Sequence, residues 1–229
     1  MSEQQADFAW IPENKGLAKL FMGSQARRNE ADGRSLRFFV YSWGIHWIDG
    51  DEEVSARWTD VDVWQEVTRH YANGVAVATE YRYTVRVTDG PAKVIQGRLR
   101  PGAARSSEAT RLVPRPGTTT MVTVEQLGRL IESGVTRTHL PWVLDRFRGG
   151  HPLSFGPLTV SRGGITAGEQ SVAWNELQEV RTVDGLVSVR RGGKWIPWKR
   201  VRVSKIPNYF VFEALVRSVL TQRPAAPLR

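Results

Sequence analysis

The chain has 229 residues, of which 41% are hydrophobic and 24% charged, values typical of a folded protein with room for two domains of about 100 residues each. It contains no cysteine, which excludes a disulfide framework, a thiolate metal site and a cysteine nucleophile. No run approaches the ~18 consecutive apolar residues of a membrane span, and the N-terminus has no apolar stretch after a basic start. We therefore expect a soluble, cytoplasmic protein without a transmembrane segment.

The formal net charge of +9 is confined to the second half of the chain. Residues 1–136 contain 17 basic and 17 acidic side chains, whereas residues 137–229 contain 15 basic and 6 acidic ones. Such an asymmetry indicates an acidic partner for the second half, or a basic surface that only keeps the protein in solution.

Two segments repeat a pattern of a strand, a Gly-Ile step, a polar turn and Trp-x-acidic-aliphatic. In the first half, Tyr41–Ile45 leads to Trp58–Val61, and in the second half Ser161–Ile165 leads to Trp174–Leu177. The spacing is four residues longer in the first half, where the acidic turn 49–53 absorbs the difference. The repeat predicts that Trp58 and Trp174 are structural residues, largely buried at equivalent positions.

A strand meander is predicted to follow each pattern. Residues 61–71 and 75–87 pair through a turn at Asn73-Gly74, and the second half has shorter strands over 180–183, 186–189 and 195–203. Between the first meander and its helix, residues 100–120 are rich in Pro, Gly, Ser, Thr and Arg. That composition predicts a mobile surface loop with at most one short strand.

An amphipathic helix is predicted to close each meander. Thr123 is the expected N-cap of the first helix, which buries a stripe containing Leu127, Leu130 and Ile131. Asn208 is the expected N-cap of the second, which begins at Tyr209 and has a longer stripe: Phe212, Leu215, Val216, Val219 and Leu220. Two further helical stretches are expected, a short one around Leu17–Phe21 and one over Leu140–Phe147, with Pro141 either in its first turn or at a kink in a longer helix.

The order of five motifs resembles the pleckstrin-homology-like (PH-like) superfold, the bacterial PH-like and GRAM-like branches in particular. The motifs are Trp58–Val61, Thr68–Tyr71 before Asn73-Gly74, Phe155–Leu158, Trp174–Leu177 and Ile206–Asn208. The chain is similar to an uncharacterised actinobacterial family with two such modules in tandem, over most of residues 36–220.

The resemblance implies an α+β, mainly β fold of two tandem modules, each an antiparallel strand meander closed by a C-terminal amphipathic helix. The first domain would be residues 1–136, with the loop of about 100–120, and the second, basic domain residues 137–229. No activity follows, because PH-like domains bind phosphoinositides, peptides or partner proteins, and many bind no lipid.

Catalytic and metal-binding motifs are not found in the sequence. The four histidines (His46, His70, His139 and His151) have no metal-ligand spacing, and no nucleophile elbow, phosphate-binding loop or dinucleotide motif occurs. The acidic cluster Asp49, Asp51, Glu52 and Glu53 could hold a divalent cation, but a solvated hairpin tip is the favoured interpretation. We expect a non-catalytic protein without a cofactor or metal.

The segment from Arg190 to Lys205 is the sharpest functional candidate, because it contains seven cations, no acid and two tryptophans. Its candidate partner-binding or anion-binding residues are Arg190, Arg191, Lys194, Trp195, Lys199, Arg200 and Arg202. Cations with tryptophan suit an acidic protein surface, anionic phospholipid headgroups or, less well, nucleic acid, whereas plain alternation would make them a solvated sheet face.

The first functional hypothesis is an interaction or adaptor module that binds an acidic protein partner through a basic face of the second domain. The alternative is a peripheral protein of the inner membrane face that binds anionic phospholipid. An enzyme with a site assembled from distant residues comes third. The sequence names neither the partner nor the oligomeric state.

Overall fold

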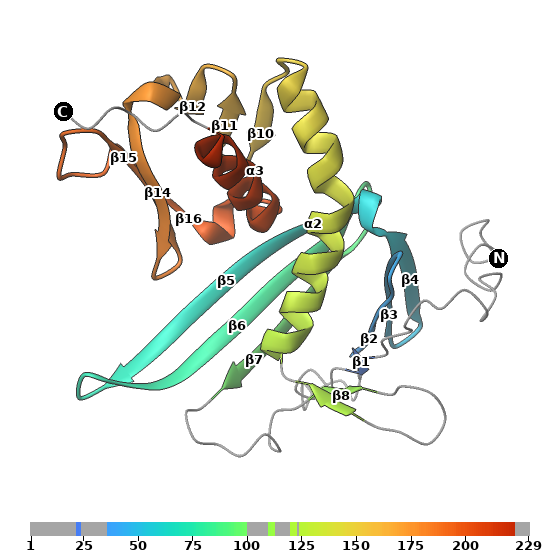
Figure 1. Cartoon of the computed structure of the whole chain (residues 1–229). Coiled ribbons are helices and arrows are strands. Elements are labelled where there is room, and N and C mark those ends of the chain that lie inside the picture. The colour runs from blue at the N-terminus through green and yellow to red at the C-terminus, as the bar shows by residue number, and fades with distance from the viewer. Residues whose placement is uncertain (1–21, 24–35, 100–109, 113–119, 123, 223–229) are drawn as a thin grey trace. The chain divides into compact units, whose positions relative to one another are not determined.

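A computed structural model describes residues 22–23, 36–99, 110–112, 120–122 and 124–222 (Figure 1). The chain divides into two compact units, the first from residues 1–62 and 67–134, the second from residues 63–66 and 135–229. The division falls inside a helix and inside a strand, both of which contribute to each unit.

The first unit contains three antiparallel sheets. A meander of β2 (Leu36–Val40), β3 (Gly44–Asp49) and β4 (Glu52–Arg57) leads through a short 3-10 turn, η1 (Trp58–Asp60), into the second sheet. That sheet has the order β5 (Val61–Ala72), β6 (Val75–Val87) and β7 (Ala92–Leu99). A small third sheet joins β1 (Met22–Gly23), β8 (Thr110–Leu112) and β9 (Thr120–Val122). In the loop over residues 100–120, where at most one short strand is predicted, β8 is a short strand and β9 begins at the last residue.

The helix α2 (Val124–Arg148) packs on the first unit through glycines. A Cβ placed on Gly128 would lie 2.0 Å from the phenol ring of Tyr83, and one on Gly134 would lie 2.4 Å from the indole of Trp58. Tyr83 and Trp58 are both 1% exposed, so the helix backbone lies directly on two buried aromatic rings. Leu127 and Ile131 of the predicted stripe are buried, and Leu130 is half-buried.

Pro141 lies in the interior of α2, a single helix of 25 residues, so the interpretation that places Pro141 inside a longer helix is correct and the one that places it in a first turn is wrong. Gly134 is the weakest helix former between the two expected stretches, and contact with Trp58 accounts for that glycine. The cap expected at Thr123 and the helix expected around residues 17–21 lie outside the described residues.

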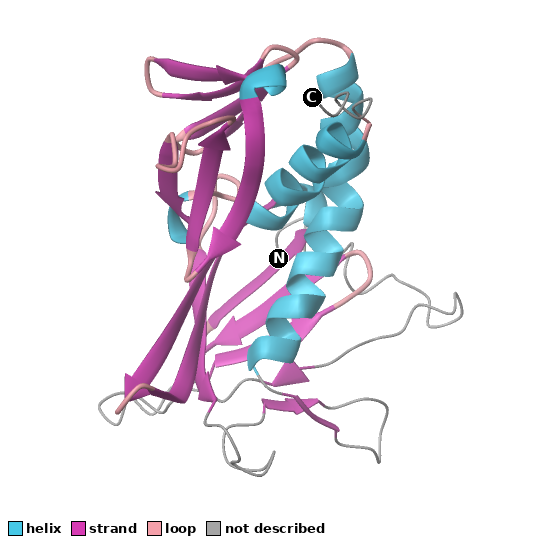
Figure 2. Cartoon of the chain, turned by 60° about the vertical axis from the view of Figure 1, so that its left-hand side comes forward, coloured by secondary structure: helices cyan, strands magenta, loops and turns pink. Residues whose placement is uncertain are grey.

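The second unit contains two antiparallel sheets and α3 (Tyr209–Thr221). The first sheet is a meander of β10 (Leu153–Phe155), β11 (Leu158–Ser161), β12 (Gly164–Ala167) and β13 (Gln170–Ala173). The 3-10 turn η2 (Trp174–Glu176) leads into β14 (Leu177–Val183), β15 (Leu186–Arg191) and β16 (Lys199–Arg202), followed by the turn η3 (Val203–Lys205). Figure 2 shows these strands in magenta and the helices in cyan.

The core of the second unit lies between α3 and its sheets. Phe212, Leu215 and Val216 of the predicted stripe are at most 3% exposed, and the rings of Phe212 and Phe155 meet edge to face at 5.5 Å. The Tyr209 hydroxyl lies 2.6 Å from Thr182 Oγ1 of β14, which places α3 against the face of β14–β15–β16 that buries Val187 and Val189. Val219 and Leu220, at the end of the stripe, are half-buried.

The two copies of the repeat make the same local hydrogen bonds. Trp58 Nε1 donates to the carbonyl of Tyr41 at 3.1 Å, and Trp174 Nε1 donates to the carbonyl of Ser161 at 2.8 Å. Each tryptophan begins a 3-10 turn that leads into a long strand. Their burial differs, since Trp58 is 1% exposed and Trp174 is half-buried.

Asn208 precedes α3 as predicted, but its side chain caps no helical N–H group. The residue has a left-handed backbone (φ 49°), and its Oδ1 accepts a hydrogen bond of 2.9 Å from the backbone N–H of Val63. Its own N–H donates to the carbonyl of Val63 at 2.8 Å. The predicted role as a side-chain cap is therefore wrong, because the left-handed backbone directs the amide to residue 63, which is 145 positions away in the sequence.

The fold is thus mainly β and antiparallel, with two α-helices among the described residues. Neither of these helices combines the length and the apolar character needed to cross a membrane. The arrangement as tandem PH-like modules stays a prediction.

Candidate functional site

The basic segment predicted from the sequence falls on the connection between β15 and β16. The strand expected over 195–203 exists but is shorter than predicted, since only Lys199–Arg202 is extended and paired. Pro197 has no N–H to donate to a ladder, and Gly193 has a φ of 71°. We call residues 192–198 the tip loop; Figure 1 shows it projecting beside β15.

Two of the predicted binding residues, Arg190 and Arg191, hold the base of the tip loop. Arg190 pairs with Glu179 at 3.4 Å, and Arg191 donates to the carbonyl of Ser171 and lies 5.6 Å from the ring centre of Trp198. The Nε atoms of both arginines are buried. Both guanidinium groups therefore make contacts within the second unit.

The far end of the tip loop exposes apolar side chains. Trp195 is 93% exposed and Ile196 is 80% exposed, the largest exposures among the large hydrophobic residues of the described chain. Lys194 beside them is also exposed. The base of the loop is tied down by backbone bonds, from Gly192 N–H to the carbonyl of Glu176 at 2.8 Å and from Lys194 N–H to the carbonyl of Arg191 at 3.3 Å.

The cations of β16 divide between the two faces of its sheet. Arg200 and Arg202 are exposed and alternate with the buried Val201, so they point away from the core. Lys199 is half-buried and lies on the same face as Val201. The outward face also carries Arg181 of β14. This residue was missed from the sequence alone because Arg181 and Arg200 are 19 positions apart in the chain, and only the strand register brings them to one row.

A lysine pairs with two carboxylates of the acidic turn between β3 and β4. Lys93 Nζ lies 3.0 Å from Asp49 Oδ2 and also contacts Glu52 Oε2. Burial lowers the pKa of Lys93, but the hydrogen bonds to Glu52 and Asp49 outweigh it and raise the pKa above its ordinary value. Across the described ranges no cluster of three metal-ligating side chains occurs.

Each of the two histidines of the first unit contacts polar side chains on a neighbouring strand. His46 Nδ1 lies 2.7 Å from Ser55 Oγ and His46 Nε2 lies 3.4 Å from Glu53, a serine–histidine–glutamate arrangement that follows from the register of β3 with β4. His70 pairs with Glu80 at 3.3 Å.

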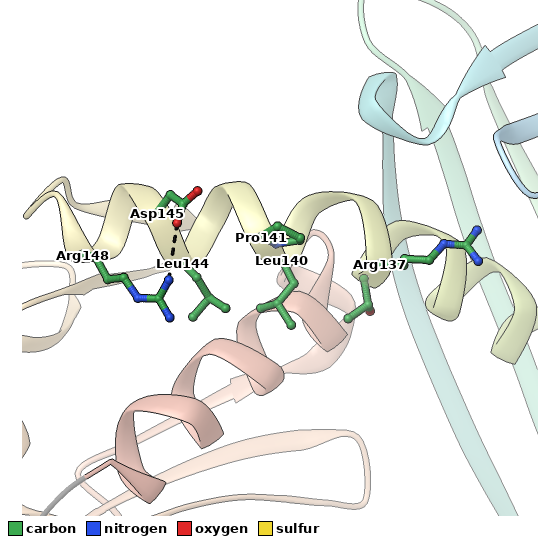
Figure 3. Close-up of a pocket in the computed structure, with 7 residues that line it drawn as sticks. Arg137, Leu140, Pro141, Leu144, Asp145 and Arg148 are labelled. Carbon is green, nitrogen blue, oxygen red and sulfur yellow. Dashed lines mark hydrogen bonds and ion pairs between the residues drawn. The ribbon is translucent and has the colours of Figure 1, made fainter.

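An apolar groove of about 420 Å³ lies along the second-unit part of α2. Figure 3 shows Leu140 and Leu144 on the side of the helix that faces α3, with Pro141 beside them. Asp145 and Arg148 at its rim pair with each other at 3.4 Å. Because one helix supplies all of the lining residues and its rim charges are paired, the tip loop is the stronger candidate site.

Residues 118–225 match the model of a family of unknown function, DUF6585. This match includes all of α2, the strands β10 to β16 and α3. No curated protein and no solved structure matches the chain.

Proposed function

We propose that the second unit is a non-catalytic module that binds an anionic phospholipid surface through the tip loop. The observation that supports the proposal is the pair Trp195 and Ile196, exposed side by side at the end of a loop whose base is held by hydrogen bonds. An isolated exposed hydrophobic residue needs no explanation, but two adjacent ones at a loop tip among cations do.

The order of the side chains suits the depth profile of a membrane interface. Tryptophan prefers the level of the headgroups, and burying isoleucine contributes on the order of 2 kcal/mol. Lys194, Arg200 and Arg202 are exposed, and each cation near an anionic leaflet contributes about 1 kcal/mol. Free-energy contributions of this size give reversible membrane binding that weakens as the salt concentration rises, which is the behaviour of a peripheral membrane protein.

An acidic protein surface, the first hypothesis from the sequence, would use the same cations. It would in addition need an apolar pocket to receive Trp195 and Ile196, whereas a membrane interface accepts both without a shaped pocket. The experiment below therefore treats capture of an acidic protein as the competing outcome.

The test is flotation with phosphatidylcholine vesicles, with and without phosphatidylserine, at low and high salt. The wild type should float with the anionic vesicles only, and less at high salt. Trp195→Ser and Ile196→Ser should each lower the partition coefficient by about tenfold or more, the equivalent of losing an apolar anchor. Trp142→Ser is the matched control, because Trp142 is also exposed (57%) but lies on α2.

Trp195 insertion has its own spectroscopic readout. The chain has nine tryptophans, so the signal is the difference between the emission of the wild type and that of Trp195→Phe. The difference spectrum should shift to the blue on anionic vesicles. A wild type that floats with no vesicle, or tip variants that float as well as the wild type, would overturn the proposal. Tip-dependent capture of an acidic protein without vesicle binding would favour the adaptor hypothesis instead.

A further inference from the structure

The outward face of β14–β15–β16 carries a row of three residues on three adjacent strands. Arg181 of β14 pairs with Ser188 of β15, and Ser188 pairs with Arg200 of β16. We call Arg181, Ser188 and Arg200 the arginine row. It lies on the face opposite Val187, Val189 and Val201, which are buried toward α3.

The row places two long cations on either side of a short hydroxyl residue. Arg181 has a side chain that is 55% exposed, and Arg200 is exposed, whereas Ser188 between them is only 8% exposed. Adjacent strands are about 4.8 Å apart, so the backbones of the two arginines stand about 10 Å apart across Ser188. This spacing lets two guanidinium groups contact opposite sides of one anion seated above the serine, each through charge-assisted hydrogen bonds of about 2.8 Å.

Acidic side chains neutralise little of this face. Glu179 pairs with Arg190 at 3.4 Å and reaches Arg181 only at 3.9 Å, so one carboxylate is shared between two arginines. Among the described residues no acid forms an ion pair with Arg200 or with Arg202, which follows Arg200 on the same face. The face therefore has an excess of positive charge centred on Arg181 and Arg200.

We propose that the arginine row is a seat for a phosphomonoester group. A phosphomonoester has a second negative charge and three terminal oxygens, which can accept from two guanidinium groups and a serine hydroxyl together. A phosphodiester, such as that of phosphatidylserine, has fewer free oxygens and one negative charge on its phosphate. This inference rests on the proposed function when the group belongs to a lipid, because the row adds headgroup selectivity to a surface held by the tip loop.

The experiment separates the lipid-borne group from the free one. Flotation compares vesicles that contain phosphatidic acid, a lipid phosphomonoester, with phosphatidylserine vesicles of the same surface potential. The wild type should bind the phosphatidic acid vesicles about tenfold more tightly, the equivalent of one additional charge-assisted hydrogen bond. In parallel, glycerol phosphate is titrated into the protein, and the backbone amide signals of Arg181, Ser188 and Arg200 are followed by NMR.

Two variants test the row. The double substitution Arg181→Gln and Arg200→Gln should remove both the preference for phosphatidic acid vesicles and the amide shifts caused by glycerol phosphate. Trp195 and Ile196 of the tip loop are unchanged in this variant, so it should still bind anionic vesicles. Arg217→Gln removes one exposed cation from α3, which covers the opposite face of the sheet, and should keep the preference.

The outcomes distinguish this inference from the proposed function. Equal binding to both anionic vesicles without glycerol phosphate shifts would overturn the seat and leave the tip loop as a membrane anchor. Shifts at the row without binding to any vesicle would support a seat for a free phosphomonoester and overturn the membrane proposal. An absence of both responses would refute both.

Discussion

Substitution of Asn208 tests the interaction that joins the start of α3 to β5. Asn208→Ala removes the acceptor of the Val63 N–H and leaves that buried donor without a partner, at a cost of about 1–3 kcal/mol. Alanine must also adopt the left-handed conformation (φ 49°), which costs a further 1–2 kcal/mol or so. The expected loss in the free energy of unfolding is therefore about 2–5 kcal/mol.

Two further substitutions separate these terms. Asn208→Gly keeps the backbone unstrained and should cost only the hydrogen bond, about 1–3 kcal/mol. Asn208→Ser is the decisive one, because serine caps helices as well as asparagine but is too short to replace the amide. Urea unfolding gives the stability, and amide exchange of Val63 gives the local effect. If Asn208→Ser is as stable as the wild type and Val63 remains protected, the side chain acts as a helix cap and the hydrogen bond to β5 carries little energy.

Three further predictions concern the second unit. Phe212→Ala should lower the free energy of unfolding by about 3–5 kcal/mol, and an unchanged urea midpoint would show that α3 is not part of the core. Gly164→Ala should destabilise the protein far more than Gly163→Ala. A Cβ on Gly164 would lie 1.9 Å from the Val172 carbonyl oxygen, whereas a Cβ on Gly163 would meet no atom within 3.5 Å. Similar melting temperatures of the two variants would contradict this backbone geometry. Burial raises the pKa of Tyr209 to about 12, so the folded state favours the neutral phenol and the stability from this group is lost as pH rises from about 10 to 12. Tyr209→Phe should remove that part of the alkaline destabilisation, and identical pH profiles of unfolding would contradict it.

The parts of the fold that could be predicted from the sequence depend on contacts between near neighbours. The turns at Asn73-Gly74 and Asp184-Gly185 have the positive φ angles that their residue types favour. The Trp58 and Trp174 turns bond to carbonyls only 17 and 13 residues earlier. The sequence left open whether a helix begins near Pro141 or continues through it, because a proline suggests either a helix start or a kink. Only the contact with Trp58 shows why a glycine occupies the middle of that helix.

The candidate site could be located from the sequence but not resolved into its parts. A run of cations with Trp195 marks the β15–β16 connection whatever the tertiary structure is. The orientation of Arg190 and Arg191 depends on Glu179 and on the carbonyl of Ser171, which other strands supply. A strand prediction that ran through Pro197 also assigned Trp195 to a sheet, whereas it lies at the end of the tip loop.

Arg190 and Arg191 at the base of the tip loop order a segment that two glycines would otherwise make flexible. A free loop would lose conformational entropy on binding, at about 1–2 kcal/mol for each residue that becomes fixed. Arg191 reduces that cost before binding, because it holds Trp198 through its guanidinium group and donates to the carbonyl of Ser171. Trp195 and Ile196 are thereby presented from a base that is already ordered, which favours binding without any contact between Arg191 and the partner. Reversing the charge of Arg191 would therefore disturb the loop itself, whereas Lys194 is exposed and only its backbone bonds to the base, so charge reversal of its side chain reports on binding.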